Sequence, residues 1–212
     1  MVLPLNEEAI LYKSAPNPRT RGSRIGGFSM VELAVSLSVM LILTAIAIPS
    51  LMRSIRVYQF NDAAARVSDM LKFTRFEAVR RNKQINFLVR ASGTDWLVGT
   101  DSDGSGTIDA TEKQQLISGF VTLLPAGASP GPPNPASITA TLGASSTLTT
   151  LSGAAGSVTF DARGAVSPLA AYVLYLGNAT DPEFGYRAVI LLPSGATQIW
   201  TAPSGGPWQR VG

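Results

Sequence analysis

The longest apolar run of the chain lies near its start and ends abruptly. Residues 28–48 contain 21 positions with one ionisable side chain, Glu32. As an α-helix rising about 1.5 Å per residue, this run measures roughly 31 Å, close to the ~30 Å hydrocarbon core of a bilayer. We therefore expect a membrane-spanning helix over residues 28–49. Its last residue, Pro49, predicts a bend, because proline lacks an N–H and its ring clashes with the carbonyl of Ala45.

A second helical pattern follows the apolar run. Apolar or small side chains recur at alternating four- and three-residue steps, which predicts an amphipathic helix over residues 50–83, ending near Asn82, with one buried stripe. Opposite charges at helical spacing support it, each pair adding a few tenths of a kcal/mol. The pairs are Asp62 with Arg66, Asp69 with Lys72, and Glu77 with Arg81. The stripe consists of Phe60, Ala64, Val67, Leu71, Thr74 and Ala78.

From residue 84 the pattern changes to short segments rich in β-branched and aromatic residues, bounded by Gly, Pro, Asn and Asp. A helix followed by strands alone predicts an α+β fold, in which one or two antiparallel sheets of a domain over 84–212 pack on the helix. Residues 125–151 begin with five prolines in eleven residues and continue rich in Ser and Thr, which predicts a long exposed loop. The predicted strands are 84–90, 95–99, 115–124, 157–160, 172–176, 187–192 and 197–201.

The composition argues against catalysis. The chain has no histidine, which removes the commonest general base and zinc ligand, and no cysteine, so no disulfide supports the fold. No pair of nucleophile and base is visible in the sequence. We expect a protein that is not an enzyme and requires no cofactor.

Charge is distributed unevenly along the chain. Basic residues of 1–27 precede the apolar run and place that leader in the cytoplasm, so the remainder faces the periplasm or the exterior. Residues 53–90 hold nine basic and three acidic side chains, and residues 91–212 hold four basic and eight acidic ones. This uneven distribution of charge has three interpretations. It gives complementarity between subunits, it attracts Arg53 and Arg56 to acidic headgroups or nucleic acid, or it is a solvated helix face.

The position of Glu32 needs an explanation, because an unpaired charge at the bilayer centre costs at least about 2.5–3.5 kcal/mol. Cleavage between Gly27 and Phe28 would make Glu32 the fifth residue and create an α-amino group close enough to pair with it. A signal peptide has an apolar region of only about 7–15 residues, although Ala45-Ile46-Ala47 has the small residues of a cleavage site. A plain anchor would fit the length but not the carboxylate.

This arrangement resembles the type IV pilin and pseudopilin class, whose prepilin peptidase cleaves after a glycine and methylates the new N-terminal phenylalanine. The resemblance implies that Gly27 and Phe28 flank the cleavage site, that Phe28 is N-methylated, and that Glu32 and Pro49 act in assembly. It also implies a cleaved leader over residues 1–27.

The resemblance narrows at residues 74–85, TRFEAVRRNKQI, which are similar to the end of the long helix in the GspH/FimT family of minor pseudopilins. Phe76 departs from that pattern, where the family more often has a small polar residue. Residues 156–164, GSVTFDARG, resemble a strand and turn of the family, with Asp161 and Gly164 suited to a tight turn. The matching helix residues are Arg75, Glu77, Ala78, Arg80, Arg81 and Asn82.

A pilin-like minor pseudopilin is a structural subunit of the pilus-like filament, or its tip, in a type II secretion system. The resemblance implies a single-pass protein of the inner membrane whose C-terminal domain lies in the periplasm. Its partners would be other pseudopilins or minor pilins and the prepilin peptidase. The alternative is a minor pilin that primes type IV pilus assembly, which the sequence does not separate from the first role.

Residues 101–112, DSDGSGTIDATE, have the oxygen-donor spacing of a calcium-binding EF-hand loop, with Gly106 at the sharp turn. Ser105 departs from the strict pattern, and the flanks are predicted strands instead of helices. The alternatives are a structural calcium site, a calcium-dependent surface binding module, or an Asp/Gly-rich turn without metal. The candidate ligands are Asp101, Asp103, Ser105, the Thr107 carbonyl, Asp109 and Glu112.

The C-terminal residues 198–212 hold Trp200, Trp208 and one cation, Arg210. Some FimT relatives in competence pili bind DNA through a basic C-terminal motif of the Gly-Arg-x-Arg kind, which is absent here. One cation neutralises too little phosphate for much affinity. Nucleic acid is therefore not expected as a partner, although a DNA-uptake receptor stays an alternative from another functional class. The tryptophans are predicted to pack on the sheet or a neighbour.

Overall fold

The computed structural model describes residues 27–124, 132–143, 148–151 and 156–211. The chain forms two compact units, Met1–Ala45 and Ile46–Gly212. The described part of the first unit contains the start of helix α1 (Met30–Arg81). The second unit, which we call the head, contains the rest of α1 and every strand found among the described residues.

Helix α1 is continuous through both predicted helical segments, and Pro49 lies inside it without ending it. The helix ends at Arg81, as predicted, in a C-terminal cap. Asn82 has a left-handed φ of 50°. The N–H of Lys83 donates to the Ala78 carbonyl and the N–H of Asn82 to the Val79 carbonyl, both at 3.2 Å. These two hydrogen bonds satisfy carbonyls that the helix end would otherwise leave unpaired.

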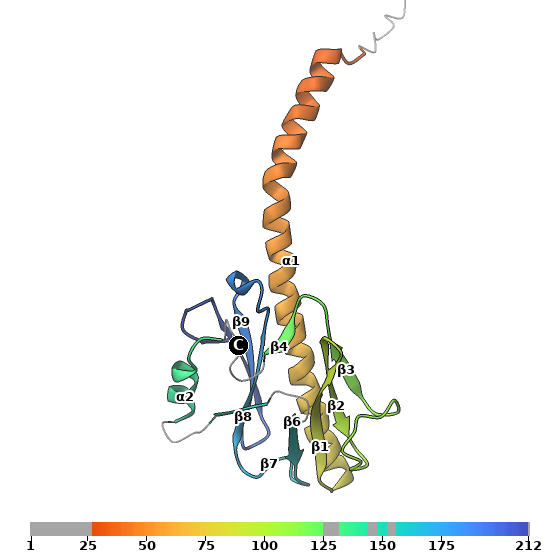
Figure 1. Ribbon diagram of the computed structural model, residues 1–212, viewed down its shortest axis with the longest axis vertical. Helices are drawn as coiled ribbons and strands as arrows, with labels where there is room; N and C mark the ends of the chain where they lie inside the picture. The colour runs from red at the N-terminus through yellow and green to blue at the C-terminus, as the bar shows by residue number, and fades with distance from the viewer. Residues whose placement is uncertain (1–26, 125–131, 144–147, 152–155, 212) are drawn as a thin grey trace, which may run out of the picture. The chain divides into compact units, whose positions relative to one another are not determined.

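The strands of the head form two sheets (Figure 1). Sheet A has the order β3-β2-β1-β6-β7 and is antiparallel throughout. Its strands are β1 (Ile85–Ser92), β2 (Asp95–Asp101), β3 (Gln114–Ile117), β6 (Gly156–Phe160) and β7 (Val166–Ser167).

Sheet B has the order β11-β10-β9-β8-β4. These strands are antiparallel, but a further strand, β5 (Leu148–Thr150), pairs with β8 in parallel, which the predicted antiparallel fold did not include. A short 3₁₀ helix, η1 (Pro182–Phe184), precedes β9. The strands of the main path are β4 (Thr122–Leu124), β8 (Ala171–Gly177), β9 (Tyr186–Leu191), β10 (Thr197–Ala202) and β11 (Gln209–Val211).

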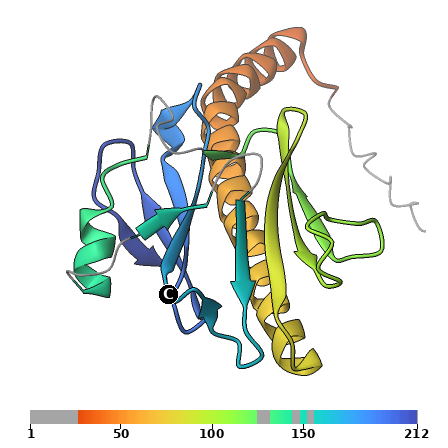
Figure 2. The same cartoon turned by 60° about the horizontal axis from the view of Figure 1, so that its bottom comes forward.

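The main core lies where the C-terminal half of α1 packs between the two sheets (Figure 2). All six residues of the predicted helix stripe are fully buried, which confirms the periodicity. The core combines Phe87 and Phe160 of sheet A with Leu174 and Val189 of sheet B. A buried cation, Arg187 of β9, also joins the sheet to the helix: its Nε donates to Oδ1 of Asn61 at 2.7 Å. Burial lowers the pKa of this guanidinium.

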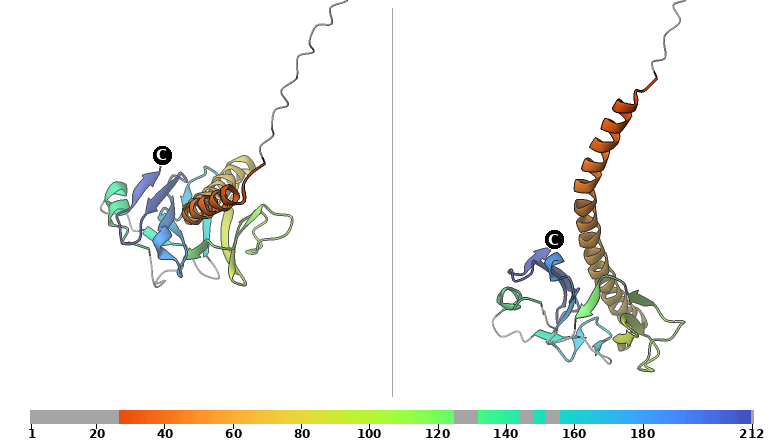
Figure 3. Two further views of the ribbon diagram at one scale, coloured as in Figure 1. Left: turned by 90° about the horizontal axis from the view of Figure 1, so that it is seen from above. Right: turned by 45° about the horizontal axis from the view of Figure 1, so that its top comes forward.

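A second core covers the other face of sheet B. Helix α2 (Ala136–Leu142) lies on the side of this sheet away from α1 (Figure 3). Trp208 packs beside Tyr175 with ring centroids 5.7 Å apart, and its indole N–H donates to the Pro133 carbonyl. Burial raises the pKa of Tyr175 to about 12. The prediction that Trp208 packs on the sheet is confirmed.

Two predictions of local structure need correction. The predicted strand 115–124 is two strands, β3 in sheet A and β4 in sheet B, separated by a turn at Gly119 with a φ of +83°. The predicted exposed loop 125–151 contains α2 and β5, and Ile138 of α2 is fully buried. Residues 125–131 and 144–147 of that loop, and residues 1–26 of the predicted leader, lie outside the described residues.

Other predictions are confirmed. Six of the seven predicted strands correspond to β1, β2, β6, β8, β9 and β10 with shifts of at most two residues at an end. The predicted turn at Asp161 and Gly164 joins β6 to β7. There Asp161 Oδ1 accepts the N–H groups of Arg163 and Ala165, and Gly164 has a φ of +80°.

Candidate functional site

The N-terminal half of α1 presents apolar side chains with no protein around them. Every described residue from Gly27 to Ile55 is exposed. Within the described part of the chain, α1 is the one helix that is long and apolar enough to cross a membrane, and none of its most apolar window is buried in the protein. An apolar helix in the core of a soluble domain would be buried. This finding is consistent with a single membrane anchor.

Glu32 lies in the first turn of α1, next to a helix cap that sequence reasoning missed. Ser29 precedes the helix, and its Oγ accepts the N–H of Glu32 at 3.1 Å. A serine three residues before a glutamate is the spacing of a capping box, which is the signal that would have revealed it. The helix dipole also favours a carboxylate in the first turn. Glu32 therefore has a local source of stabilisation besides the amine predicted for cleaved Phe28.

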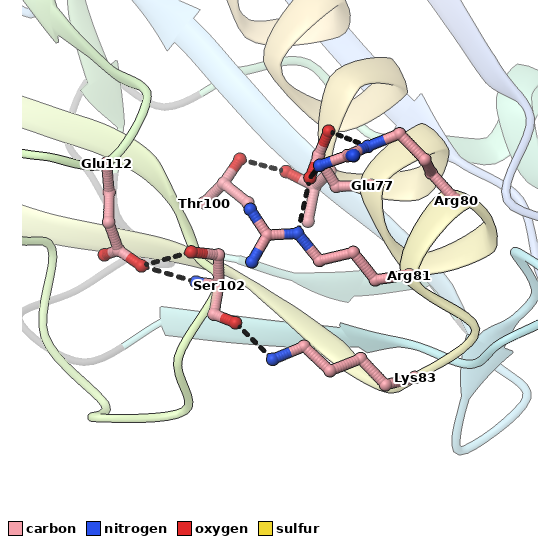
Figure 4. A network of polar contacts seen from close by, with 8 residues as sticks. Glu77, Arg80, Arg81, Lys83, Thr100, Ser102 and Glu112 are labelled. Carbon is pink, nitrogen blue, oxygen red and sulfur yellow. Dashed lines mark hydrogen bonds and ion pairs between the residues drawn. The ribbon is translucent and has the colours of Figure 1, made fainter.

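The other end of α1 carries an ion-pair network centred on Glu77, whose side chain is only 8% exposed (Figure 4). Arg80 donates through Nε and Nη2 to the two carboxylate oxygens at 2.9 and 2.8 Å, and Arg81 Nε donates to Oε2 at 2.7 Å. The hydrogen bond from Arg80 lowers the pKa of Glu77, and Arg81 lowers it further, against the opposing effect of burial. The predicted pairs Asp62–Arg66 and Asp69–Lys72 also form.

The acidic loop, residues 101–112, joins β2 to β3 and is organised around the buried Asp101. Its Oδ1 accepts the N–H groups of Gly104 and Ser105 at 2.7 and 3.1 Å. Its Oδ2 accepts the N–H of Gly106 at 3.0 Å and the side-chain amide of Asn86 at 3.1 Å. Asp101 therefore closes the loop by accepting four hydrogen bonds.

Two further carboxylates complete the loop. Glu112 Oε1 accepts both the N–H and the hydroxyl of Ser102, and its Oε2 accepts the N–H of Asp109. The N–H and hydroxyl of Ser105 lower the pKa of the exposed Asp103. These bonds run within the loop, so it has a defined conformation from its own side chains.

Two cations outside the loop hold it to the rest of the head, and neither was identified from the sequence. Lys83, just after α1, donates to the Ser102 carbonyl at 2.6 Å (Figure 4). Arg90 of β1 donates to the Gly106 carbonyl at 2.8 Å. Both hydrogen bonds go to main-chain carbonyls, which every residue has, so the sequence does not show which carbonyl is the partner.

The loop meets part of the requirement for a cation site. Carboxylate oxygens of Asp101, Asp103 and Glu112 lie within 4.8 Å of one another, so three ligands could converge on one ion. Asp109 does not belong to this group among the described residues. Instead, its Oδ1 accepts the Thr107 hydroxyl, while Ser105 hydrogen-bonds to Thr107. Three of the four predicted carboxylate ligands are therefore gathered. Calcium takes six to eight oxygens, so calcium binding stays a prediction.

Residues 63–195 match the family model described as Type II transport protein GspH. The match covers more than half of the chain. The chain belongs to the GspH family. It is thus a pilin-like protein, as its sequence resemblance indicated.

Two solved structures resemble this GspH family member, and both are crystal structures of the type IV minor pilin FimU from Pseudomonas aeruginosa (strain PAO1). Their TM-scores are 0.46 and 0.45, each at 18% sequence identity. The alignments cover 73% and 71% of this chain and 93% and 96% of the FimU chains. A comparison with curated proteins found no match.

The GspH match contains residues 63–81 of α1, the acidic loop and most of both sheets. The predicted cleavage and assembly residues Gly27, Phe28, Glu32 and Pro49 precede it. The structure places Glu32 and Pro49 on one continuous helix and leaves Gly27 and Phe28 just before it. Their roles therefore rest on the sequence pattern.

Proposed function

We propose that this protein is a minor pseudopilin, a structural subunit of the pilus-like filament or its tip in a type II secretion system. The observation that carries the proposal is the GspH family match over residues 63–195. It is supported by the exposed apolar start of α1, which provides a helix for packing in the membrane and in a filament.

The proposed mechanism is physical and needs no catalytic step. After cleavage, the Phe28 amine pairs with the Glu32 carboxylate within one subunit or between two, because an unpaired carboxylate in lipid is costly. This pairing sets the register in which apolar helices pack. The head then lies on the periplasmic side, where it contacts other pseudopilins or minor pilins.

The first test is intact-mass and N-terminal peptide analysis of the protein from its native membrane. A mature chain that begins with N-methylated Phe28 would support processing by a prepilin peptidase. A chain that begins at Ile48, or one that keeps its leader, would contradict the pilin-type role.

A second test separates the two machines. Deletion of the gene is expected to stop release of type II secretion substrates, and expression of the wild-type chain should restore it. Loss of surface pili with intact secretion would instead identify a minor pilin that primes a type IV pilus. Loss of DNA uptake with both other functions intact, together with salt-sensitive DNA retention by a membrane-free fragment, would favour the DNA-uptake receptor.

A further inference from the structure

The segment of α1 that follows the apolar run has an unusual charge pattern. Between Glu32 and Asp62 there is no acidic residue, and the only charged side chains are Arg53 and Arg56. Asp62 is itself paired with Arg66 at 2.8 Å. This part of the helix therefore carries two positive charges, one turn apart, without an acidic neighbour on the same helix.

The length of the helix places these arginines at the membrane surface. Residues 28–48 fill roughly 31 Å, and a bilayer measures about 40–45 Å when its headgroup layers are included. Arg53 and Arg56 lie five and eight residues beyond Ile48, roughly 8 and 12 Å along the helix. Their long side chains can reach the headgroup layer from there.

Arg56 is held in place by two other side chains of the head, Gln59 and Phe120. Its Nη1 donates to Oε1 of Gln59 at 3.1 Å, and its guanidinium lies 4.0 Å from the ring centroid of Phe120. The Phe120 ring makes edge contacts with Phe60 and Phe184, at centroid distances of 5.7 and 5.3 Å. An arginine has five N–H donors in a rigid fork. A stacked Arg56 with one donor used therefore presents the others in a fixed orientation, which favours binding of a planar or tetrahedral oxyanion.

The opposite face of the same turns suits the membrane interface. Leu51, Ile55 and Tyr58 follow one another at helical spacing and are 61%, 43% and 70% exposed. Tyrosine is enriched where headgroups meet hydrocarbon, because its ring is apolar and its hydroxyl is polar. This segment thus combines an apolar face with a basic face, as amphipathic helices at membrane surfaces do.

We infer that Arg53 and Arg56, with Arg56 positioned by Phe120, bind the phosphates of anionic phospholipids where α1 leaves the membrane. Phosphate is the matching group because arginine binds it with charge-assisted, often paired hydrogen bonds. Binding would tether the base of the head to the membrane surface. The inference requires the membrane span but not the filament, so it stands independently of the proposed type II secretion role.

The test uses the full chain inserted in nanodiscs of phosphatidylcholine mixed with phosphatidylglycerol. Native mass spectrometry then measures which lipids remain on the protein after it leaves the nanodisc. Wild type is expected to retain phosphatidylglycerol preferentially. Each arginine near an anionic surface contributes about a five-fold preference, so Arg53→Gln/Arg56→Gln should lose on the order of twenty-five-fold.

Three variants sharpen the result. Arg163→Gln removes an exposed cation on the turn after β6 and should leave the preference unchanged. Arg53→Gln alone alters a side chain with no described partner, so it should fold normally and lose about five-fold. Phe120→Leu keeps both charges and should lose part of the preference through Arg56. Equal retention of both lipids by wild type would overturn the inference, and so would an undiminished preference for phosphatidylglycerol in the double variant. The arginines would then be available for acidic groups of a neighbouring subunit.

Discussion

At the scale of single residues, two turns of the head meet where neither has room for a side chain. Gly195 has a φ of +79°, and a Cβ added there would overlap the Gly164 carbonyl oxygen. Arg75 bridges the same place, since its Nε donates to that carbonyl at 3.0 Å. Gly195→Ala should therefore lower the free energy of unfolding by about 2 kcal/mol or more, from backbone strain and displacement of the turn. Chemical denaturation of the detergent-solubilised chain measures this loss.

A matched glycine provides the control. Gly93 has a φ of +64°, but nothing lies within 4 Å of its added Cβ. Gly93→Ala should show only the strain of a left-handed alanine, about 1 kcal/mol. An equal loss in the two variants would show that the contact between the two turns contributes nothing.

The Glu77 network makes stability depend on pH. Its two arginines lower the pKa of Glu77 below the ordinary value of 4.5, so the unfolded chain binds a proton more readily. The stabilising contribution is present in full above about pH 4.5 and is lost as pH falls through the lower native pKa. Glu77→Gln should lower the unfolding free energy by about 1–2 kcal/mol at neutral pH, since it loses charged hydrogen bonds to partly exposed arginines.

The difference between wild type and Glu77→Gln should shrink as the pH falls towards 2, in denaturation series at several pH values. A difference in unfolding free energy that stays constant with pH would mean that the negative charge of Glu77 contributes nothing to stability. Asp69→Asn, which breaks an exposed pair with Lys72, should change stability by less than about 0.5 kcal/mol throughout.

At the scale of elements, the acidic loop should depend on Asp101 even without metal. Asp101→Ala removes the acceptor for the N–H groups of Gly104, Ser105 and Gly106. A loss of about 2 kcal/mol is expected in the presence of EDTA. Asp109→Ala removes one long hydrogen bond from an exposed position and should cost little. Thermal unfolding followed by circular dichroism compares them, and equal midpoints would contradict the structural role of Asp101.

Calcium should add to this stability if the sequence prediction holds. The ion would relieve repulsion among Asp101, Asp103 and Glu112, so millimolar calcium should raise the unfolding midpoint of the wild-type chain above its value in EDTA. Asp103→Ala should abolish the increase while costing little in EDTA, because Asp103 is exposed. A midpoint that does not respond to calcium would leave the loop as a hydrogen-bonded turn.

How much each element could be predicted depends on whether its signal is local. The helical spacing of buried positions from Phe60 to Ala78 continues over five turns, so the sequence predicts this part of α1 and its end near Asn82. The division of 115–124 was not, because the partners of Ile117 and Leu123 are Trp96 and Leu176, far away in sequence. Only the Ser118-Gly119 pair marked the break.

Helix α2 was missed for a different reason. Its seven residues follow several prolines and carry Ser and Thr, a composition typical of loops. Its stability comes from Ile138 in the second core and from the backbone N–H of Trp208, which donates to Ser137 Oγ at 3.2 Å. Tertiary packing overrides weak local propensity here. The acidic loop shows the same limit, since its spacing was visible but its anchors Lys83 and Arg90 were not.

At the scale of the whole molecule, the predicted assembly depends on one carboxylate. Glu32→Ala should leave the head folded, because the described residues from Gly27 to Ile55 make no buried contact. It should nevertheless reduce incorporation into filaments, since the Phe28 amine loses its partner and the register of packed helices is no longer set. Crosslinking in membranes, with Ser38→Ala as an exposed control on the same helix, measures this. Normal assembly of Glu32→Ala would contradict the proposed pairing of the Phe28 amine with the Glu32 carboxylate.

The buried residues of α1 begin at Phe60, whereas its earlier turns make no contribution to either core. A protease that cuts α1 between Pro49 and Arg56 would thus sever the chain without opening the head. The released product would be a compact, water-soluble fragment that keeps both sheets and their helix. A folded fragment in the soluble fraction would therefore report that the head has separated from the predicted membrane-spanning part of α1.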